Sequence, residues 1–272
     1  CAQIGHGGYG FIGGIDPAST VTVRSTGGSV ALAGGSSTNT YAQIGHGGRT
    51  SASTKAGDVT VTAAQRVDLN GAGGQDAYAQ IGHVGSSGTA GGKVTVTAGT
   101  GLSLEAGGGH SSHARIGHGG RLNAGDKTGD IKVSVTDGDL SLQGGVQQFA
   151  YAQIGHGASF DSATNVSADG SICVDVGGKI SLGVSTAAGG FGGHAQIGHG
   201  GRMVNGVHNG SINVVSGTKA ALGGGIELRG ALTSAASRFA QIGHGGVYSN
   251  GAMSGDISVV SLNGGSVTLV GG

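Results

Sequence analysis

Short stretches in which apolar residues occupy every second position recur along the whole chain in groups of three. The first stretch, run A, reads A-x-I-G-H. The second, run B, has a β-branched residue followed two positions later by valine, and the third, run C, has leucine preceded two positions earlier by Val, Leu or Ile. A period of two is typical of a β-strand that buries one face. The chain is therefore expected to consist of repeated units of three short strands.

The repeat spans the whole chain, residues 1–272, which we interpret as one domain of seven units. The histidines that end run A are 35 to 45 residues apart: His6, His46, His83, His118, His156, His199 and His244. The same residue types recur at equivalent positions in every unit, which indicates that equivalent side chains stack on one another. A solenoid whose coils pair as parallel strands has this property. We therefore predict an all-β parallel β-helix with three strands per coil and seven coils.

A seven-bladed β-propeller is the alternative fold, because seven units of this length also match its blades. Propeller blades normally have four strands and buried aromatic residues. Each unit here has three alternating runs, and only 4% of the residues are aromatic. These two features favour the solenoid.

The composition agrees with a tightly stacked β structure. Glycine accounts for 64 of 272 residues, but there is one proline and no Gly-X-Y period, which excludes collagen. Disorder fits poorly, because 36% of the residues are hydrophobic and only 10% are charged. Two cysteines, Cys1 and Cys173, are too few and too far apart in the coil scheme for a disulfide framework.

The charge distribution excludes two classes of partner. The chain has 14 basic and 14 acidic residues, scattered along its length, and a formal net charge of zero. Nucleic acids and acidic membrane surfaces are bound by clustered Lys and Arg. The sequence has no apolar run of the roughly 18 residues that cross a bilayer. We therefore expect no nucleic-acid partner and no membrane span.

The repeated histidine is the most conspicuous candidate for chemistry. Alternation places it on the inward side of run A, and a column of identical histidines offers one imidazole per coil. Metal sites instead gather several His, Cys and carboxylate groups around one point. We predict a structural ladder of neutral imidazoles that bond to backbone carbonyls or to each other, with no metal and no cofactor. A metal-binding or pH-sensing row is the alternative, and the ladder should loosen below about pH 6.

The other face of run A is expected to point outward and to form a contact face of aromatic rings and amides. Its residues are Tyr41, Gln43, Tyr78, Gln80, Tyr151, Gln153, Gln196, Phe239 and Gln241. Amides stacked along a parallel ladder can bond to each other. We expect this strip to bind a second chain laterally, or a glycan.

Catalysis is not expected. The only glutamates, Glu105 and Glu227, lie in the third and sixth units, or about 14 Å apart at the spacing of parallel strands. Glycosidases place two carboxylates about 5 to 9.5 Å apart. The sequence also has neither a G-x-S-x-G nucleophile motif nor a phosphate-binding glycine loop with its lysine. We therefore predict that the chain is not an enzyme.

Runs B and C resemble the repeats of filamentous-haemagglutinin-like exoproteins, as in GDVTVTAAQRVDLNGAGG (57–74) and GGKVTVTAGTGLSLEAGGG (91–109). The resemblance covers all seven units, whereas the AQIGH signature of run A departs from that family's pattern. It implies a right-handed β-helix exported by two-partner secretion, located outside the cell or on its surface, in a stalk, adhesin or fibre.

The features together predict a structural, self-associating and non-catalytic segment of a bacterial surface fibre or adhesin. The segment is expected to be a piece of a longer chain or one subunit of a stacked fibre. Its partners would be copies of itself or flanking repeats, end to end or side by side, with glycans or a cell surface as further candidates. A carbohydrate- or ice-binding solenoid is the alternative, the latter suggested by the runs TVTV (20–23) and VTVT (59–62 and 94–97).

Overall fold

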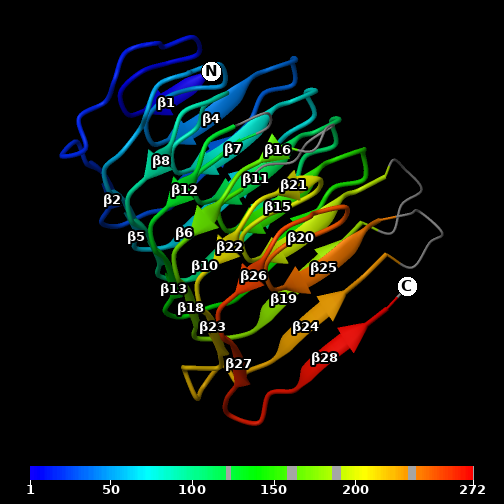
Figure 1. The fold of residues 1–272 in the computed structure, drawn as a ribbon. Coiled ribbons are helices and arrows are strands. Elements are labelled where there is room, and N and C mark those ends of the chain that lie inside the picture. Colours follow the sequence, from blue (N-terminus) through cyan, green and yellow to red (C-terminus); the bar gives the residue numbers. More distant parts are fainter. Residues whose placement is uncertain (121–123, 158–163, 186–190, 232–236, 272) are drawn as a thin grey trace.

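A computed structural model describes residues 1–120, 124–157, 164–185, 191–231 and 237–271. The described chain is a parallel β-helix of seven coils, in which runs A, B and C each build one seven-stranded parallel sheet (Figure 1). Sheet A contains β1(Ala2–Ile4), β4(Tyr41–Ile44), β7(Tyr78–Ile81), β11(His113–Ile116), β15(Tyr151–Ile154), β20(His194–Ile197) and β25(Phe239–Ile242). Sheet B contains β2(Val21–Ser25), β5(Val59–Ala63), β9(Val94–Ala98), β13(Ile131–Val135), β18(Ile172–Val176), β23(Ile212–Ser216) and β27(Ile257–Ser261). Sheet C contains β3(Val30–Ala33), β6(Arg66–Asn70), β10(Gly101–Glu105), β14(Leu140–Gly144), β19(Ile180–Val184), β24(Ile226–Arg229) and β28(Val267–Val270).

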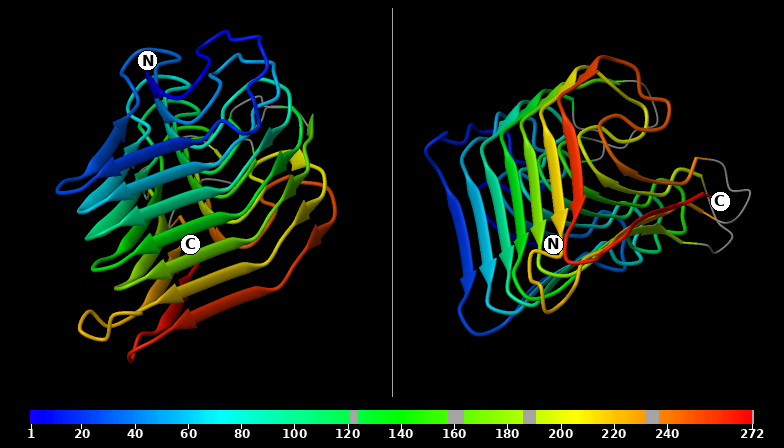
Figure 2. Two further views of the ribbon diagram at one scale, coloured as in Figure 1. Left: turned by 90° about the vertical axis from the view of Figure 1, so that its left-hand side faces the viewer. Right: turned by 90° about the horizontal axis from the view of Figure 1, so that it is seen from below.

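The register of the strands confirms the solenoid and excludes the propeller. Each residue pairs with the equivalent residue of the neighbouring coil, so that Ile44 is the partner of both Ile4 and Ile81. A propeller would pair consecutive strands within one blade. Here consecutive strands of a coil lie in different sheets, and Figure 2 shows the strands of each sheet lying in parallel, one coil beside the next.

Sheets A, B and C enclose one continuous apolar core. The core is made of the inward residues of the three runs, stacked in columns of Ala and Ile from sheet A, β-branched residues from sheet B and Leu from sheet C. In the middle coils these side chains are completely buried, as with Val96, Leu104 and Ile116. Stacking equivalent residues at the spacing of parallel strands leaves each methyl group in contact with its counterpart above and below, which gives the dense packing that a stable core needs.

The structure corrects the number of strands per coil. A fourth, two-residue strand is present in five coils and forms its own parallel sheet: β8(Ala90–Gly91), β12(Lys127–Thr128), β17(Ala168–Asp169), β22(His208–Asn209) and β26(Met253–Ser254). A further two-stranded sheet pairs β16(Thr164–Asn165) with β21(Val204–Asn205). These strands lie in the connections between sheets A and B. Figure 2 (right) shows these connections at one side of the three main sheets, where they form a second lobe beside the main core.

Two smaller expectations concern the membrane and the cysteines. Among the described residues there is no helix that is long and apolar enough to cross a bilayer. Cys1 is exposed and Cys173 is half-buried, and both are free thiols. The absence of a disulfide between them agrees with the distance that the coil scheme predicts.

Candidate functional site

The seven repeated histidines form an unbroken ladder at the corner between sheets A and B. Neighbouring rings are stacked almost parallel, with centroids 4.5 to 5.2 Å apart. The backbone N–H of every histidine except His244 donates to Nδ1 of the histidine in the following coil, at 2.9 to 3.1 Å. The ladder is therefore directional, because every bond between neighbouring histidines runs from one coil to the next in chain order.

The second ring nitrogen bonds to the preceding coil. Nε2 of each histidine from His46 onward lies 2.7 to 3.2 Å from a backbone carbonyl of the preceding coil. This carbonyl belongs to a residue just before run B of the preceding coil. Since Nδ1 accepts a hydrogen bond and a carbonyl can only accept one, the ring must be neutral with its proton on Nε2. Each imidazole thus fastens the corner of its own coil to the coil before it. The structure places the ladder where the sequence predicts it, inside the solenoid and bonded to backbone groups.

Burial and the direction of these bonds both disfavour a second proton on the rings. A proton on Nδ1 would point at the N–H group that already donates to it. Burial lowers the pKa of His118 to about 4 and that of His199 to about 3. It also lowers the pKa of His83 and His156 well below the usual value, and the neighbouring histidines add to the effect. The rings from His46 to His244 are consequently neutral at physiological pH.

Removing one ring should destabilise the rod. In His118→Ala, the N–H of His83 and the carbonyl of Gly92 would lose their partners in a buried place. Each unsatisfied buried group costs about 1 to 3 kcal/mol, so we expect the free energy of unfolding to fall by about 2 to 3 kcal/mol. Chemical denaturation at pH 7.5 measures this loss. His6→Ala is the control, because the ring of His6 is exposed at the end of the ladder, and it should cost well under 1 kcal/mol.

The predicted contact face is wrong in its exposure, because the outward side of sheet A is buried. Tyr41, Gln43, Tyr78, Gln80, Tyr151, Gln153 and Gln196 are at most 4% exposed, whereas Phe239 and Gln241 in the last coil are half-buried. The connections between sheets A and B fold back over this side as the second lobe. In the predicted coil these connections are corner loops, and the alternation within run A gives no sign that they return across the strand.

The glutamines bond to the backbone of the neighbouring coil. Nε2 of Gln80 donates to the carbonyl oxygens of Gly117 and Gly119 in the next coil, at 2.8 and 3.1 Å. Gln3, Gln153 and Gln196 make the equivalent pair of bonds. The glutamine column therefore ties successive coils together on one side of sheet A, as the histidine column does at the corner. Bonding from amide to amide, which the sequence suggested, is limited to Gln153 and Gln196, at 3.4 Å.

The aromatic residues before the glutamines form a second column of stacked rings. It runs through Tyr41, Tyr78, His113, Tyr151, His194 and Phe239, with centroids 4.7 to 5.1 Å apart and planes within 10° of parallel. Stacked aromatic pairs stabilise a fold by more than the burial of their area alone would give. The rings are used for contact between coils, so they do not provide a lateral surface for a second chain or a sugar.

The second lobe holds two buried lysines that the sequence pattern did not predict. Lys55 and Lys127 are fully buried. They occupy equivalent positions in two coils that are separated by one other coil. The column of equivalent residues, in coil order, is Lys55, Ala90, Lys127, Ala168 and His208. Nζ of Lys55 donates to the carbonyls of Ser51, Ser53 and Ser87. Burial lowers the pKa of Lys55 to about 8 and that of Lys127 to about 7. In every one of these coils a glycine lies two residues after this position. This constant spacing is the sequence signal that could have shown these residues to be equivalent.

Arg115 is the one cation in the glutamine column. It is fully buried and donates to the carbonyl of Gly157 at 2.6 Å and to the hydroxyl of Tyr151 at 2.7 Å. No carboxylate pairs with it in the described part of the chain, and burial lowers its pKa. A buried charge without an opposite charge is costly.

Replacing this arginine by the residue of the other coils should therefore stabilise the protein. In Arg115→Gln the amide can make the two backbone bonds that Gln80 makes, and the buried charge disappears. We expect the free energy of unfolding to rise by about 1 kcal/mol, measured by urea denaturation at pH 7.5. Gln80→Arg is the reciprocal control and should lower stability. A loss of stability in Arg115→Gln would mean that the bond to Tyr151 outweighs the cost of the charge.

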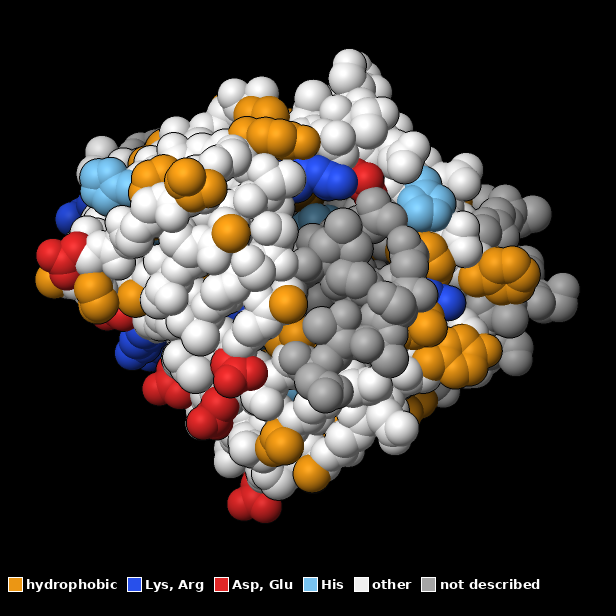
Figure 3. Space-filling model, turned by 45° about the horizontal axis from the view of Figure 1, so that its top comes forward, with side chains coloured by type: hydrophobic (Ala, Val, Ile, Leu, Met, Phe, Trp, Pro, Cys, Tyr) orange, Lys and Arg blue, Asp and Glu red, His pale blue; other side chains and the backbone are white. Residues whose placement is uncertain are grey.

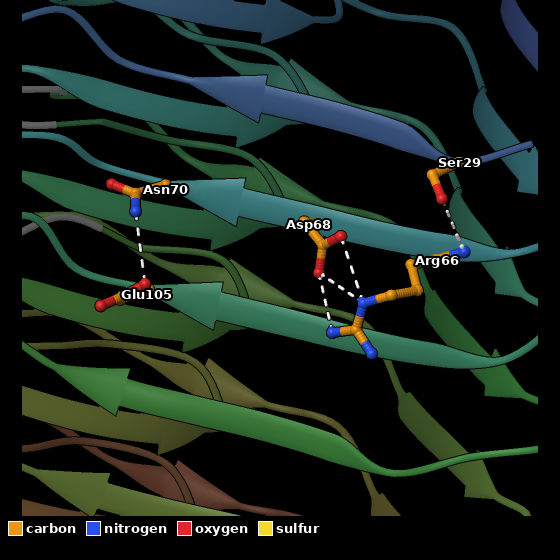
Figure 4. A network of polar contacts seen from close by, with 5 residues as sticks. All are labelled: Ser29, Arg66, Asp68, Asn70 and Glu105. Atoms are coloured by element: carbon orange, nitrogen blue, oxygen red, sulfur yellow. Dashed lines mark hydrogen bonds and ion pairs between the residues drawn. The ribbon is translucent and has the colours of Figure 1, made fainter.

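The described carboxylates lie apart from one another in the ion pairs and hydrogen bonds that the structure shows. On the outer face of sheet C, Arg66 forms an ion pair with Asp68, and Asn70 donates to Glu105 from the neighbouring strand (Figure 4). Glu227 pairs with Arg229 at the other end of the same sheet. Within the described ranges, no three His, Cys, Asp or Glu residues come together in a way that could hold a metal ion.

The outer face of sheet B carries a short threonine array. Thr60 and Thr62 pair in register with Thr95 and Thr97, and Thr22 extends one row into the first coil. Lys132 and Cys173 then interrupt the first row, and Ser134 and Asp175 the second. Figure 3 shows another face of the molecule, on which backbone and uncharged polar side chains predominate and hydrophobic and charged groups are scattered.

Comparisons with protein-family models, with curated proteins and with solved structures found no match to this chain. The polar residues that recur in run A therefore have to be interpreted from their geometry. In the described coils nearly all of them bond to backbone groups of a neighbouring coil, which makes the candidate site an internal one: the interface between coils.

Proposed function

We propose that this chain is a rigid, non-catalytic rod that serves as a structural segment of a bacterial extracellular or cell-surface fibre or adhesin. One observation carries the proposal: the His and Gln side chains that repeat most regularly are used to fasten coil to coil. An enzyme or a receptor of similar composition would direct some of these groups toward a ligand.

The arrangement suits a rigid structural element. Three seven-stranded sheets run in register along the rod, and the histidine, glutamine and aromatic columns add side-chain bonds at each junction. A solenoid of this kind is stabilised by the interfaces between neighbouring repeats. The resemblance of runs B and C to filamentous-haemagglutinin-like exoproteins supports the location outside the cell.

Immunogold electron microscopy on intact cells of the source organism tests this proposal. Antibodies raised against the folded chain should label the cell surface or material shed from it. Labelling that appears only after the cells are permeabilised would overturn the proposal. A cytoplasmic protein of known abundance, probed in the same cells, controls for leakage.

Ice binding by the outer face of sheet B is the second candidate function, favoured by the in-register threonines of the second and third coils. Thermal hysteresis of a solution of the chain measures it. If ice is bound there, Thr60→Lys together with Thr95→Lys should abolish the hysteresis without changing the melting temperature. A wild-type chain without hysteresis would exclude this function.

A further inference from the structure

The corner between sheets B and C is irregular in one coil. Six of its seven turns have two to five residues, whereas the turn of the sixth coil, between β23 and β24, has nine, residues 217–225. Figure 2 (left) shows this loop extending outward beyond the end of β23. Insertions in single repeats of a solenoid lie on one face, which is often the binding face. An insertion at one otherwise uniform corner therefore points to a local function.

The insertion is fastened to the coils before it. Its first three residues, 217–219, donate backbone hydrogen bonds to the fifth coil, at 2.8 to 3.1 Å. The side chain of Lys219 reaches further and forms an ion pair with Asp137 of the fourth coil. At the other end of the loop Gly225 N–H donates to Oγ of Ser216 at 3.2 Å, which closes the loop at its base. The loop is thus a preformed wall, and a ligand beside it would not have to order it.

Between this loop and the outer face of sheet C lies a groove of about 340 Å³. This volume is at the lower end of the range for ligand sites, which is about 300 to 1,000 Å³. Residues of the fifth, sixth and seventh coils line the groove. Its polar side chains are Lys179, Ser181, Glu227 and Thr268, and most of the remaining lining is backbone at Gly224, Gly225, Gly264 and Gly265. The groove therefore suits a small polar ligand or a short piece of a longer one.

Glycine at position 225 lets Lys179 lie against the backbone of the sixth coil. Cγ and Cδ of Lys179 are 3.6 and 3.8 Å from the position that a Cβ atom on Gly225 would take. The backbone N–H of Lys179 donates to Oδ1 of Asp139 at 2.7 Å, which fixes the start of the side chain. Its ammonium group forms no ion pair or hydrogen bond with the residues that the structure describes. The three donors of this group are therefore available to a ligand.

The charges around the groove balance. Glu227 forms an ion pair with Arg229, and Lys179 is matched by Asp139 in the coil before it. A strongly charged ligand of either sign would therefore meet as much repulsion as attraction. The groove instead offers donors on Lys179, acceptors on Glu227, and hydroxyl groups on the two remaining polar residues that can do both. The hydroxyl groups of a sugar have the same double capacity.

We propose that this groove binds a neutral glycan, whose hydroxyl groups bond to the polar side chains of the lining. A peptide is disfavoured, because β19 and β24 are paired on both sides within sheet C and leave no strand edge for an extended chain. The two large apolar residues of the lining, Ile180 and Ile226, are each 1% exposed, so they form no pocket for an apolar side chain. The proposal deepens the adhesin function and rests on it.

Titration of the ¹⁵N-labelled chain with glucose, galactose, mannose and N-acetylglucosamine tests the proposal by NMR. At least one of these sugars should shift the amide signals of Ser181, Glu227 and Thr268 in a saturable way, and leave those of Thr60 and Thr97 on sheet B unchanged. Galacturonic acid and triglycine are the probes for a charged sugar and for a peptide. The proposal is overturned if only one of these two saturates the groove, or if no probe does.

Three variants establish where the sugar binds. Lys179→Met keeps the stem but removes the donors, and should weaken binding about tenfold. Lys132→Met is the matched control, because Lys132 is an equally exposed lysine on the outer face of sheet B, and it should bind as the wild type does. Ser181→Trp fills the groove from an exposed position, so it should abolish the shifts with an unchanged melting temperature. Shifts that persist in Ser181→Trp would contradict the proposal.

The outcomes separate this site from the function on which it rests. Surface labelling of cells by a chain that binds no sugar would leave the fibre function standing while the groove proposal fails. Sugar binding by a chain that is found only inside cells would leave the groove standing while the adhesin function fails.

Discussion

Lowering the pH from 7.5 to 5 is expected to remove most of the stability of this protein, because the histidine ladder cannot accept protons while the rod is folded. Each buried ring already uses Nδ1 as an acceptor and Nε2 as a donor. The unfolded chain has no such constraint, and its histidines titrate near the ordinary value of about 6.5. Protons therefore bind the unfolded state preferentially as the pH falls.

The sign and size of the effect follow from the pKa values. The pKa of His118 is about 4 when folded, and that of His199 about 3. Their contribution to stability is complete above the unfolded pKa of about 6.5 and is lost as the pH falls toward the folded value. At pH 5 the loss is about 2 kcal/mol for each of these rings. His83 and His156 are shifted in the same direction, so the loss approaches the total stability of a typical domain.

Urea denaturation at pH 7.5, 6.5, 5.5 and 5 measures this effect, and the slope against pH gives the number of protons taken up on unfolding. His118→Gln should be less stable at pH 7.5 but should take up about one proton fewer, which separates the ladder from other titrating groups. A midpoint that stays constant between pH 7.5 and 5 would contradict this account of the ladder.

The substitution Gly82→Ala is expected to lower the free energy of unfolding by about 4 kcal/mol, because it combines backbone strain with a clash against a neighbouring coil. Gly82 follows the isoleucine of run A and has φ +138°, a conformation that residues with a side chain rarely adopt. A Cβ atom there would lie 2.1 Å from the carbonyl oxygen of Gly117 in the next coil. This carbonyl is backbone directly after β11 and accepts a hydrogen bond from Nε2 of Gln80, so it cannot move aside without disturbing the junction between the coils.

Gly108→Ala, in the same coil, is the matched control. Gly108 is exposed, has no atom within 4 Å of the position that a Cβ would take, and lies outside the left-handed region. This substitution should change the free energy of unfolding by less than about 0.5 kcal/mol. Equal losses for the two variants would show that helical stacking of the coils does not depend on the close approach at Gly82. Both values come from denaturation curves with circular dichroism at pH 7.5.

The fold could be predicted from this sequence because the same pattern of three runs occurs in all seven coils. The period-two alternation in runs A, B and C identifies the strands and the face that each buries, and the recurrence of the same residues identifies which strands are neighbours. The position of the histidine ladder follows for the same reason, since His46 shares the face of Ala42 and Ile44.

The sequence by itself determined the elements, their register and the inward columns, since these depend on local periodicity and on equivalence between repeats. Only the tertiary structure decided what happens to the other face of sheet A. The connection from run A to run B contains no strong periodic pattern, yet it folds back over Tyr41 and Gln43 and buries them. Whether a side chain that points away from one core meets water or a second layer depends on where a distant segment packs. Alternation along a strand does not show whether such a second layer is present. For this reason the face that was predicted to be exposed is buried inside the molecule.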